Sequence, residues 1–248
     1  MMRICHSGIG LFAMLAVVGS LGADSAAQAQ AAAGTERFEV TSIKAVRPTL
    51  VNTLTALQQR DVAHARAAFE AYDSAWNGIE FYINTRSRDM YSLLEHEYQA
   101  RITKALAEPS PDIPALTADA QGMLAKFDEA IAMIEKAAPL DPLFDDVARL
   151  RIVRAHLREM EPALKAGNLE RARKSFMAFD ETWDSIEDLI KARSADAYVA
   201  IEKGMVEIEK ALMPDNPNVG EVTGLVNNVM NQYNAVLAEI AKEARARR

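Results

Sequence analysis

The strongest constraint on the fold of this chain is an internal repeat. When the sequence is compared with itself at an offset of 107 residues, residues 56–95 fall on residues 163–202, and 16 of these 40 positions are identical. The only two tryptophans, Trp76 and Trp183, match each other. This agreement far exceeds chance and predicts that one structural unit occurs twice.

The match extends on both sides of this segment. Downstream the offset becomes 106, because Ile102 then falls on Ile208. The prolines between the copies end helices and mark a joint. We therefore predict a first repeat over residues 43–137, a linker over 138–149 and a second repeat over 150–245.

Within each copy the apolar residues follow the spacing of amphipathic helices. In the first copy Val62, Phe69, Trp76 and Ile83 recur at seven-residue steps, which place them on one helix face. Short polar breaks separate the helical stretches, so neighbouring helices should run antiparallel. The expected fold is all-α, a tandem duplication of an antiparallel three-to-four-helix bundle unit. In the first copy helices are predicted over 43–58, from 62 to about 86, through 91–102 and over 113–136.

Helix starts are marked by residues that cap N-termini well. Asp61 and its counterpart Asn168 precede the second helix of each copy. Ser87 and Ser194, each followed two residues later by aspartate, mark the start of the third.

The N-terminal residues predict export. A positive start with Arg3 precedes an apolar run over residues 9–21 and the small-residue cleavage pattern of residues 27–29. This order is typical of a secretory signal peptide over residues 1–29. A flexible segment over residues 30–42 and a periplasmic location are expected. No later stretch approaches the roughly 18 apolar residues of a membrane helix, so we expect no membrane insertion after cleavage.

Composition excludes several classes of function. The only cysteine, Cys5, lies before the predicted cleavage site, so the mature protein can have no disulfide, no thiolate-bound metal and no haem c. The net charge of −7 and the confinement of the one basic cluster to residues 242–248 make nucleic acid a poor partner. No nucleophile triad, phosphate loop or metalloprotease motif is present, so we expect the protein not to be an enzyme.

The repeat singles out polar residues that occur in both copies. On a helical wheel of about 100° per residue, Asp73 and Glu80 lie about 20° apart, at the edge of the apolar stripe. Tyr91 and Glu95 follow on the next predicted helix. If the two helices are neighbours, these four side chains converge. Their counterparts in the second copy are Asp180, Glu187, Tyr198 and Glu202.

Two interpretations of this constellation remain open. Carboxylates with a phenol suit a hard cation such as iron, manganese or calcium. Alternatively, repeated arginines neutralise the carboxylates in structural ion pairs and no ion binds. The arginines are Arg66 and Arg86, with Arg173 and Arg193 in the second copy.

The histidines give a weaker signal. His64, His96 and His156 are not repeated in the other copy, which argues against a paired haem ligand. His156 and Glu159 lie on one helix face, a spacing found in metal-binding helical proteins, although an ordinary surface histidine explains the pair more simply.

The repeated pattern resembles a known family. Asp180, Trp183, Glu187, Tyr198 and Glu202 are spaced as in the extracytoplasmic helical region of bacterial high-affinity iron and lead permeases. The resemblance covers about 35 residues in each copy. The chain lacks the family's membrane helices and its Arg-Glu-Gly-Leu-Glu type motif. The resemblance therefore implies a free-standing accessory protein that binds iron or another divalent or trivalent cation and delivers it to an inner-membrane metal permease.

Overall fold

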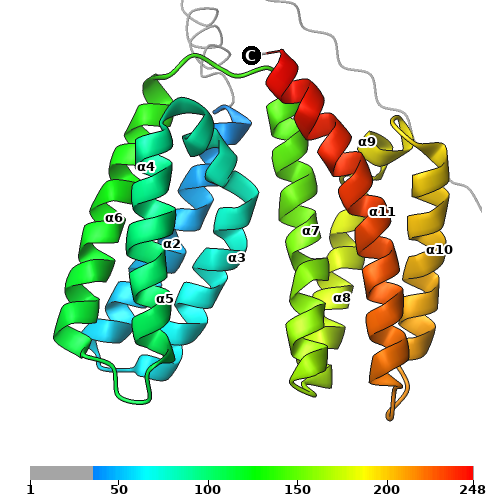
Figure 1. The fold of residues 1–248 in the computed structure, drawn as a ribbon, viewed down its shortest axis with the longest axis horizontal. Helices are drawn as coiled ribbons and strands as arrows, with labels where there is room; N and C mark the ends of the chain where they lie inside the picture. Colours follow the sequence, from blue (N-terminus) through cyan, green and yellow to red (C-terminus); the bar gives the residue numbers. More distant parts are fainter. Residues whose placement is uncertain (1–35, 248) are drawn as a thin grey trace, which may run out of the picture. The chain divides into compact units, whose positions relative to one another are not determined.

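The computed structural model of the chain describes residues 36–247, in which all regular structure is helical (Figure 1). The predicted all-α class is confirmed. The predicted signal peptide lies outside the described residues. The elements of the first half are α2 (Phe38–Gln58), α3 (Val62–Arg86), α4 (Arg88–Ser92), the π-helix η1 (Leu93–Gln99), α5 (Ala100–Ala107) and α6 (Ile113–Lys136). Those of the second are α7 (Leu143–Lys165), α8 (Leu169–Trp183), α9 (Glu187–Lys191), α10 (Ala195–Leu212) and α11 (Val219–Ala246).

The helices of both halves pack around one continuous cluster of buried apolar residues. In the first half α2 packs against α3 and α6, and η1 and α5 pack against α6. In the second half α7 packs against α8 and α11, and α10 packs against α11. Helices α3 and α7 contact each other and join the two halves (Figure 1).

The predicted helix starts are confirmed by their capping bonds. The side chain of Asp61 accepts a hydrogen bond from the backbone N–H of His64, and Asn168 accepts the equivalent bond at α8. Ser87 caps α4 and Ser194 caps α10 in the same way. Each bond satisfies one of the free N–H groups of a first helical turn.

The first helix begins earlier than its apolar spacing predicts. Helix α2 starts at Phe38, inside the segment expected to be flexible, and buries Val40 and Ile43. Arg37 anchors this start, because its guanidinium donates to the carbonyls of Ile134 and Ala137 at the end of α6, at 2.6 and 2.7 Å. The spacing of apolar residues along the chain cannot predict such contacts, because they join residues about 100 positions apart.

The two halves differ at the π-helix. In the first half η1 interrupts the helix that continues into α5, whereas α10 is α-helical throughout. A π-turn holds more residues than an α-turn, so one added residue can be absorbed there without ending the helix. This accounts for the change of offset from 107 to 106, after which Ile102 and Ile208 are both fully buried.

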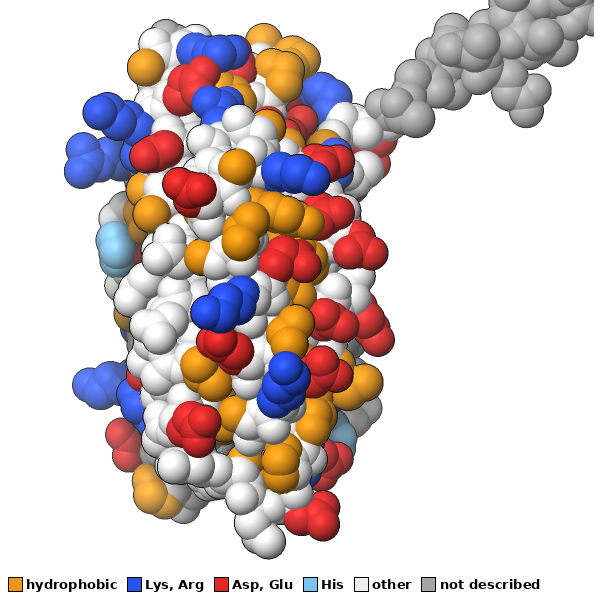
Figure 2. Space-filling model, turned by 90° about the vertical axis from the view of Figure 1, so that its right-hand side faces the viewer, with side chains coloured by type: hydrophobic (Ala, Val, Ile, Leu, Met, Phe, Trp, Pro, Cys, Tyr) orange, Lys and Arg blue, Asp and Glu red, His pale blue; other side chains and the backbone are white. Residues whose placement is uncertain are grey.

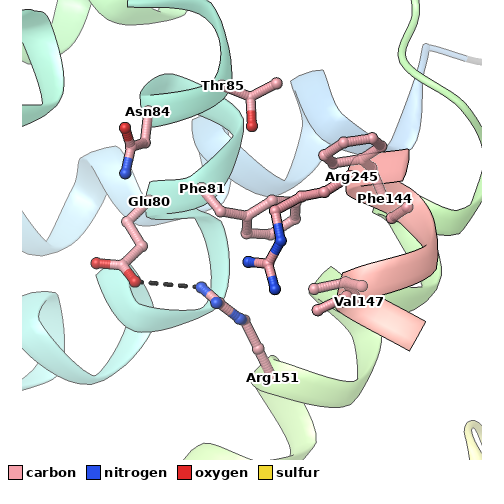
Figure 3. A pocket seen from close by; sticks show the side chains of 10 residues that line it. Glu80, Phe81, Asn84, Thr85, Phe144, Val147, Arg151 and Arg245 are labelled. Atoms are coloured by element: carbon pink, nitrogen blue, oxygen red, sulfur yellow. Dashed lines mark hydrogen bonds and ion pairs between the residues drawn. The ribbon is translucent and has the colours of Figure 1, made fainter. Parts of the chain in front are cut away.

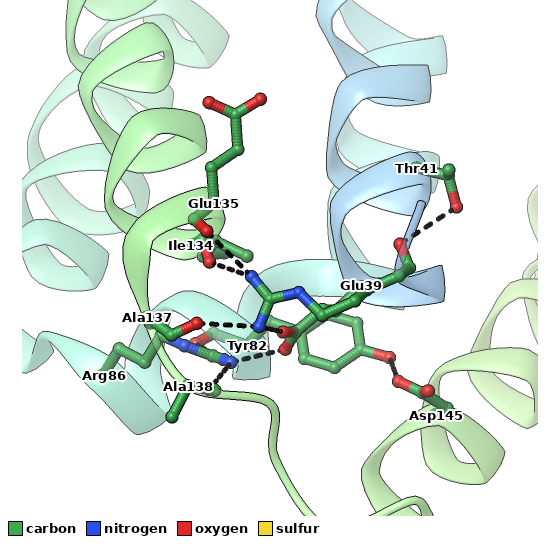
Figure 4. A network of polar contacts seen from close by, with 10 residues as sticks. Glu39, Thr41, Tyr82, Arg86, Ile134, Glu135, Ala137, Ala138 and Asp145 are labelled. Atoms are coloured by element: carbon green, nitrogen blue, oxygen red, sulfur yellow. Dashed lines mark hydrogen bonds and ion pairs between the residues drawn. The ribbon is translucent and has the colours of Figure 1, made fainter. Parts of the chain in front are cut away.

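A buried ion-pair network closes one end of the first half (Figure 4). Glu39 is 2% exposed and pairs with the guanidinium of Arg86, and Arg37 lies 2.8 Å from its other oxygen. Nearby, the hydroxyl of Tyr82 donates to Asp145 of α7 at 2.6 Å. Arg86 therefore forms a structural ion pair as predicted, but with Glu39 and not with the repeated carboxylates of α3, because tertiary packing brings it a different acid.

The surface mixes charge signs and exposed apolar side chains. Figure 2 shows basic and acidic side chains interspersed around a line of hydrophobic ones on one face. Val199 and Val206 are exposed apolar residues seven positions apart on one side of α10, and exposed Met213 follows at the same spacing directly after the helix ends at Leu212. Among the described residues, no helix combines the length and apolarity needed to cross a membrane.

Three buried tyrosines predict loss of stability at high pH. Burial is the main cause that raises the pKa values of Tyr72, Tyr82 and Tyr233 above the usual value near 10. Their contribution is complete below the unfolded-state pKa and is lost as pH rises above it, by about 1.4 kcal/mol per pH unit for each tyrosine. Urea unfolding should show little change of stability between pH 9 and 10 and a decline that approaches this slope above pH 10, and Tyr82→Phe and Tyr233→Phe should each reduce the decline. Equal slopes in all three proteins would contradict the assignment.

Candidate cation site in the first half

The repeated arginines Arg66 and Arg173 act on helix ends and not on the candidate acids. Arg66 donates to the carbonyls of Leu106 and Glu108, at 2.6 and 2.8 Å, where α5 ends. Arg173 donates to Leu212 and Pro214, at 3.2 and 2.6 Å, where α10 ends. These carbonyls lack partners within their own helix, and a cation there also interacts favourably with the helix dipole. The expected pairing of Arg66 and Arg173 with the repeated acids is therefore wrong.

Asp73 lies on α3 and is partly open to solvent. Its side chain is 49% exposed and lines a groove with Thr103 and Leu106 of α5. The side-chain amide of Gln99 donates to its Oδ1 at 2.7 Å. Arg158 of α7 approaches its other oxygen only to 3.9 Å. The carboxylate is thus oriented by an amide and keeps an accessible oxygen.

Glu95 lies on η1 and is held by a tryptophan. The indole Nε1–H of Trp76 donates to its carboxylate, and Trp183 donates to Glu202 in the same way in the second half. Tyr91 stacks on Trp76 with ring centroids 6.3 Å apart, and Tyr198 stacks on Trp183 at 6.4 Å. The repeated tryptophan, glutamate and tyrosine therefore form one shared packing motif.

Glu80 is ion-paired with an arginine of α7. Nη1 of Arg151 donates to its Oε1 at 3.1 Å. Burial raises the pKa of Glu80, and the charge of Arg151 opposes this shift. Glu80 is therefore in the ion-paired state that the second interpretation predicted, although the arginine comes from α7 and not from the repeated set.

Two buried polar residues of this region, Tyr72 and Gln99, were not among the site residues predicted from the sequence. Tyr72 is fully buried, and its hydroxyl has no hydrogen-bond partner among the described residues. Burial and the negative charges of Glu95, Asp73 and Glu80 raise its pKa well above the usual value. Gln99 is 7% exposed, and its carbonyl oxygen Oε1 also lacks a partner within the described residues. Such unpaired buried oxygens are costly and call for an explanation.

The second half has apolar residues at the corresponding positions. Phe179 stands where the first half has Tyr72, and Met205 corresponds to Gln99 at the offset of 106. Phe179 is fully buried and Met205 is 7% exposed. The repeat comparison could therefore have pointed to Tyr72 and Gln99, because they are polar in the first copy and apolar in the second.

The predicted ligands of the second half are also arranged differently. Asp180 is exposed, and α8 ends at Trp183, so Glu187 lies in the first turn of the separate helix α9. Burial and the charges of Glu202 and Glu187 raise the pKa of Tyr198. Asp180 and Glu187 therefore do not reproduce the arrangement of the first half, whereas Tyr198 and Glu202 keep their contacts with Trp183.

The candidate donors of the first half are all oxygens. They are the carboxylates of Asp73 and Glu95 and the unpartnered oxygens of Tyr72 and Gln99. In the described part of the chain, no group of three or more His, Cys, Asp or Glu side chains is arranged to hold a metal ion. A cation here would therefore rely on two carboxylates and on neutral donors, as calcium and other hard cations can do.

Comparisons with known proteins give no further assignment. No protein-family model, curated protein or solved structure matches this chain. The relation to the iron and lead permeases thus remains a prediction from the repeated motif.

Proposed function

We propose that this protein is an exported helical-bundle protein that binds a hard cation through its first half and delivers it to a membrane metal transporter. The observation that carries the proposal is the pair of unpartnered buried oxygens on Tyr72 and Gln99. Both belong to the half in which Asp73 and Glu95 are held by neutral donors.

The asymmetry between the halves supports a ligand role for these oxygens. Both halves share the tryptophan–glutamate bond and the tyrosine stack, so these contacts serve the fold wherever the unit occurs. Such recurring contacts also favour a tandem duplication as the origin of the chain. A buried hydroxyl and a buried amide oxygen are not needed for that fold, because Phe179 and Met205 fill the same places in the second half. We infer that the first half retains them for a cation.

Charge and access also favour a cation. Two carboxylates give a formal charge of −2, of which Arg158, 3.9 Å from Asp73, offsets a part, so a cation is still attracted. Asp73 is reached from the groove between α3 and α5. The indole of Trp76 and the amide of Gln99 each hold one carboxylate in place, as groups behind metal ligands commonly do. The signal-peptide pattern supports a periplasmic location, and the family resemblance supports an inner-membrane permease as the partner.

The proposal is tested by a variant in which the two polar residues of the first half are replaced by the apolar residues found at the corresponding positions of the second half. We expect Tyr72→Phe combined with Gln99→Met to weaken binding of Fe²⁺ or Mn²⁺ by at least about tenfold, because two of the four donors are lost. The same variant should unfold at equal or higher urea concentration in the absence of metal, since it removes unsatisfied buried polar groups. Calorimetric titration and metal analysis of the purified proteins measure the first effect, and urea denaturation measures the second.

A matched control changes the other half. Phe179→Tyr combined with Met205→Gln places the same side chains in the second half, where Asp180 is exposed, and should leave the binding of one ion per chain unchanged. Equal affinity of the first-half variant and the unmodified protein, or no metal binding by either, would refute the cation site.

A second candidate function is a structural or protein-interaction module without metal. The ion pair of Glu80 with Arg151 and the exposed apolar line on α10 favour it. A line of apolar side chains at seven-residue spacing suits the packing of a partner helix. This alternative predicts that Val206→Lys abolishes partner binding and that the Tyr72 and Gln99 variant leaves it intact.

A further inference from the structure

A second pocket lies where α3, α7 and α11 meet (Figure 3). Its volume is about 230 Å³. Phe81, Phe144 and Val147 form its apolar walls, and the rings of Phe81 and Phe144 stack with centroids 6.0 Å apart. The guanidinium groups of Arg151 and Arg245 also line it.

The pocket lining contains two guanidinium groups but only one carboxylate, that of Glu80. Arg151 uses Nη1 for its bond to Glu80, and its buried Nε has no hydrogen-bond partner among the described residues. Arg245 has no ion-pair partner in the same part of the chain. Burial lowers the pKa of Arg151, and the charge of Arg245 acts in the same direction. The pocket thus holds excess positive charge in a protein whose net charge is −7.

A neighbouring arginine adds to this excess. Arg154 lies three residues after Arg151 on α7 and donates to the side-chain oxygen of Asn234 at 2.9 Å. The corresponding pair in the first half is Arg47 with Asp128, a 2.6 Å ion pair. The second half therefore has a neutral amide where the first has a carboxylate. Burial and the charge of Arg151 lower the pKa of Arg154.

We propose that this pocket binds a small organic carboxylate with an aromatic or other apolar body. A guanidinium group binds a carboxylate through two parallel N–H bonds, and a second guanidinium adds to the attraction. The phenylalanine and valine walls suit an apolar body. A cavity of about 150 Å³ holds benzene, so 230 Å³ accommodates a ligand of about the size of benzoate. The proposal is independent of the cation site, since it uses neither Asp73 nor Glu95.

The test uses benzoate as the probe in calorimetric titration of the full chain. We expect Arg245→Gln to weaken benzoate binding by about tenfold or more, because a charge-assisted hydrogen bond is lost. Lys242→Gln removes one positive charge from an exposed position of the same helix and should leave the affinity within about twofold. Arg245 is also exposed, so both variants should fold.

A third variant tests whether the excess positive charge near the pocket contributes to binding, and it leaves the residues that line the pocket unchanged. Asn234→Asp restores the ion pair of the first half and should weaken benzoate binding by about fivefold through the added negative charge. It should leave cation binding by the first half unchanged, which separates this proposal from the proposed function.

Two further probes decide the ligand class. Inorganic phosphate should bind more weakly than benzoate, because it leaves the apolar walls uncovered, and benzyl alcohol should not bind measurably, because it lacks the charge. Absence of benzoate binding, equal binding of benzyl alcohol, tighter binding of phosphate or unchanged affinity in Arg245→Gln would each overturn the proposal.

Discussion

Replacing Arg86 with alanine is expected to lower the free energy of unfolding by about 3–5 kcal/mol, because it breaks a buried ion pair. The side chains of Arg86 and Glu39 are 8% and 3% exposed. Without Arg86, the ion pair with Arg37 is the one left to the Glu39 carboxylate among the described residues, and the carboxylate stays buried (Figure 4). The same substitution also removes the bond from Arg86 to the carbonyl of Ala138, at 3.2 Å, after α6.

The repeat supplies a control of the same chemistry. Arg193 corresponds to Arg86 and pairs with Glu243 of α11, but these side chains are 34% and 33% exposed. Arg193→Ala should therefore cost at most about 1 kcal/mol, the usual contribution of a surface ion pair. Urea denaturation of the two variants measures the difference. Similar losses in both would show that the burial of the Glu39 pair does not govern its contribution.

Replacing Trp76 with alanine should lower the free energy of unfolding by a similar amount, about 3–5 kcal/mol, through the cavity left in the core. Trp76 is fully buried and its ring lies against those of Tyr72, Tyr91 and Phe127. The change also leaves Glu95 without its indole donor. Trp183 remains as the only tryptophan, so its fluorescence can report unfolding of the variant.

A conservative variant separates packing from hydrogen bonding. Trp76→Phe keeps an aromatic ring but removes the N–H, so it should cost about 1–3 kcal/mol. Much of that loss should disappear when Glu95→Leu removes the unpaired carboxylate as well. A loss below about 1 kcal/mol for Trp76→Ala would show that the first-half core repacks around the gap.

Local sequence signals predicted the helices well. Asp61, Ser87, Asn168 and Ser194 cap helices as predicted, because a cap involves residues only three positions apart. The apolar spacing also predicted the burial of Trp76 and Ile83 on α3, since a helix face depends only on residue spacing. These properties arise within one or two helical turns.

Charge pairing could not be predicted from local signals. Arg86 was expected beside the α3 acids but pairs with Glu39 on α2, and Glu80 pairs with Arg151 on α7. Which acid an arginine meets depends on how helices far apart in the sequence pack. Comparison of the two copies limits the acids that could pair with the repeated arginines to a few. It contains no information about contacts between one copy and the other.

The sequence by itself determined the all-α class, the helix starts and the apolar faces, because these follow from short-range backbone and side-chain chemistry. It also contained the one-residue change of offset that the π-helix η1 absorbs and the Tyr72 to Phe179 difference between the copies. Only the tertiary structure decided that Asp73 and Glu95 have neutral donors, whereas Glu80 is ion-paired. The physical reason is that hydrogen bonds and ion pairs require contact in space, which packing between distant helices creates.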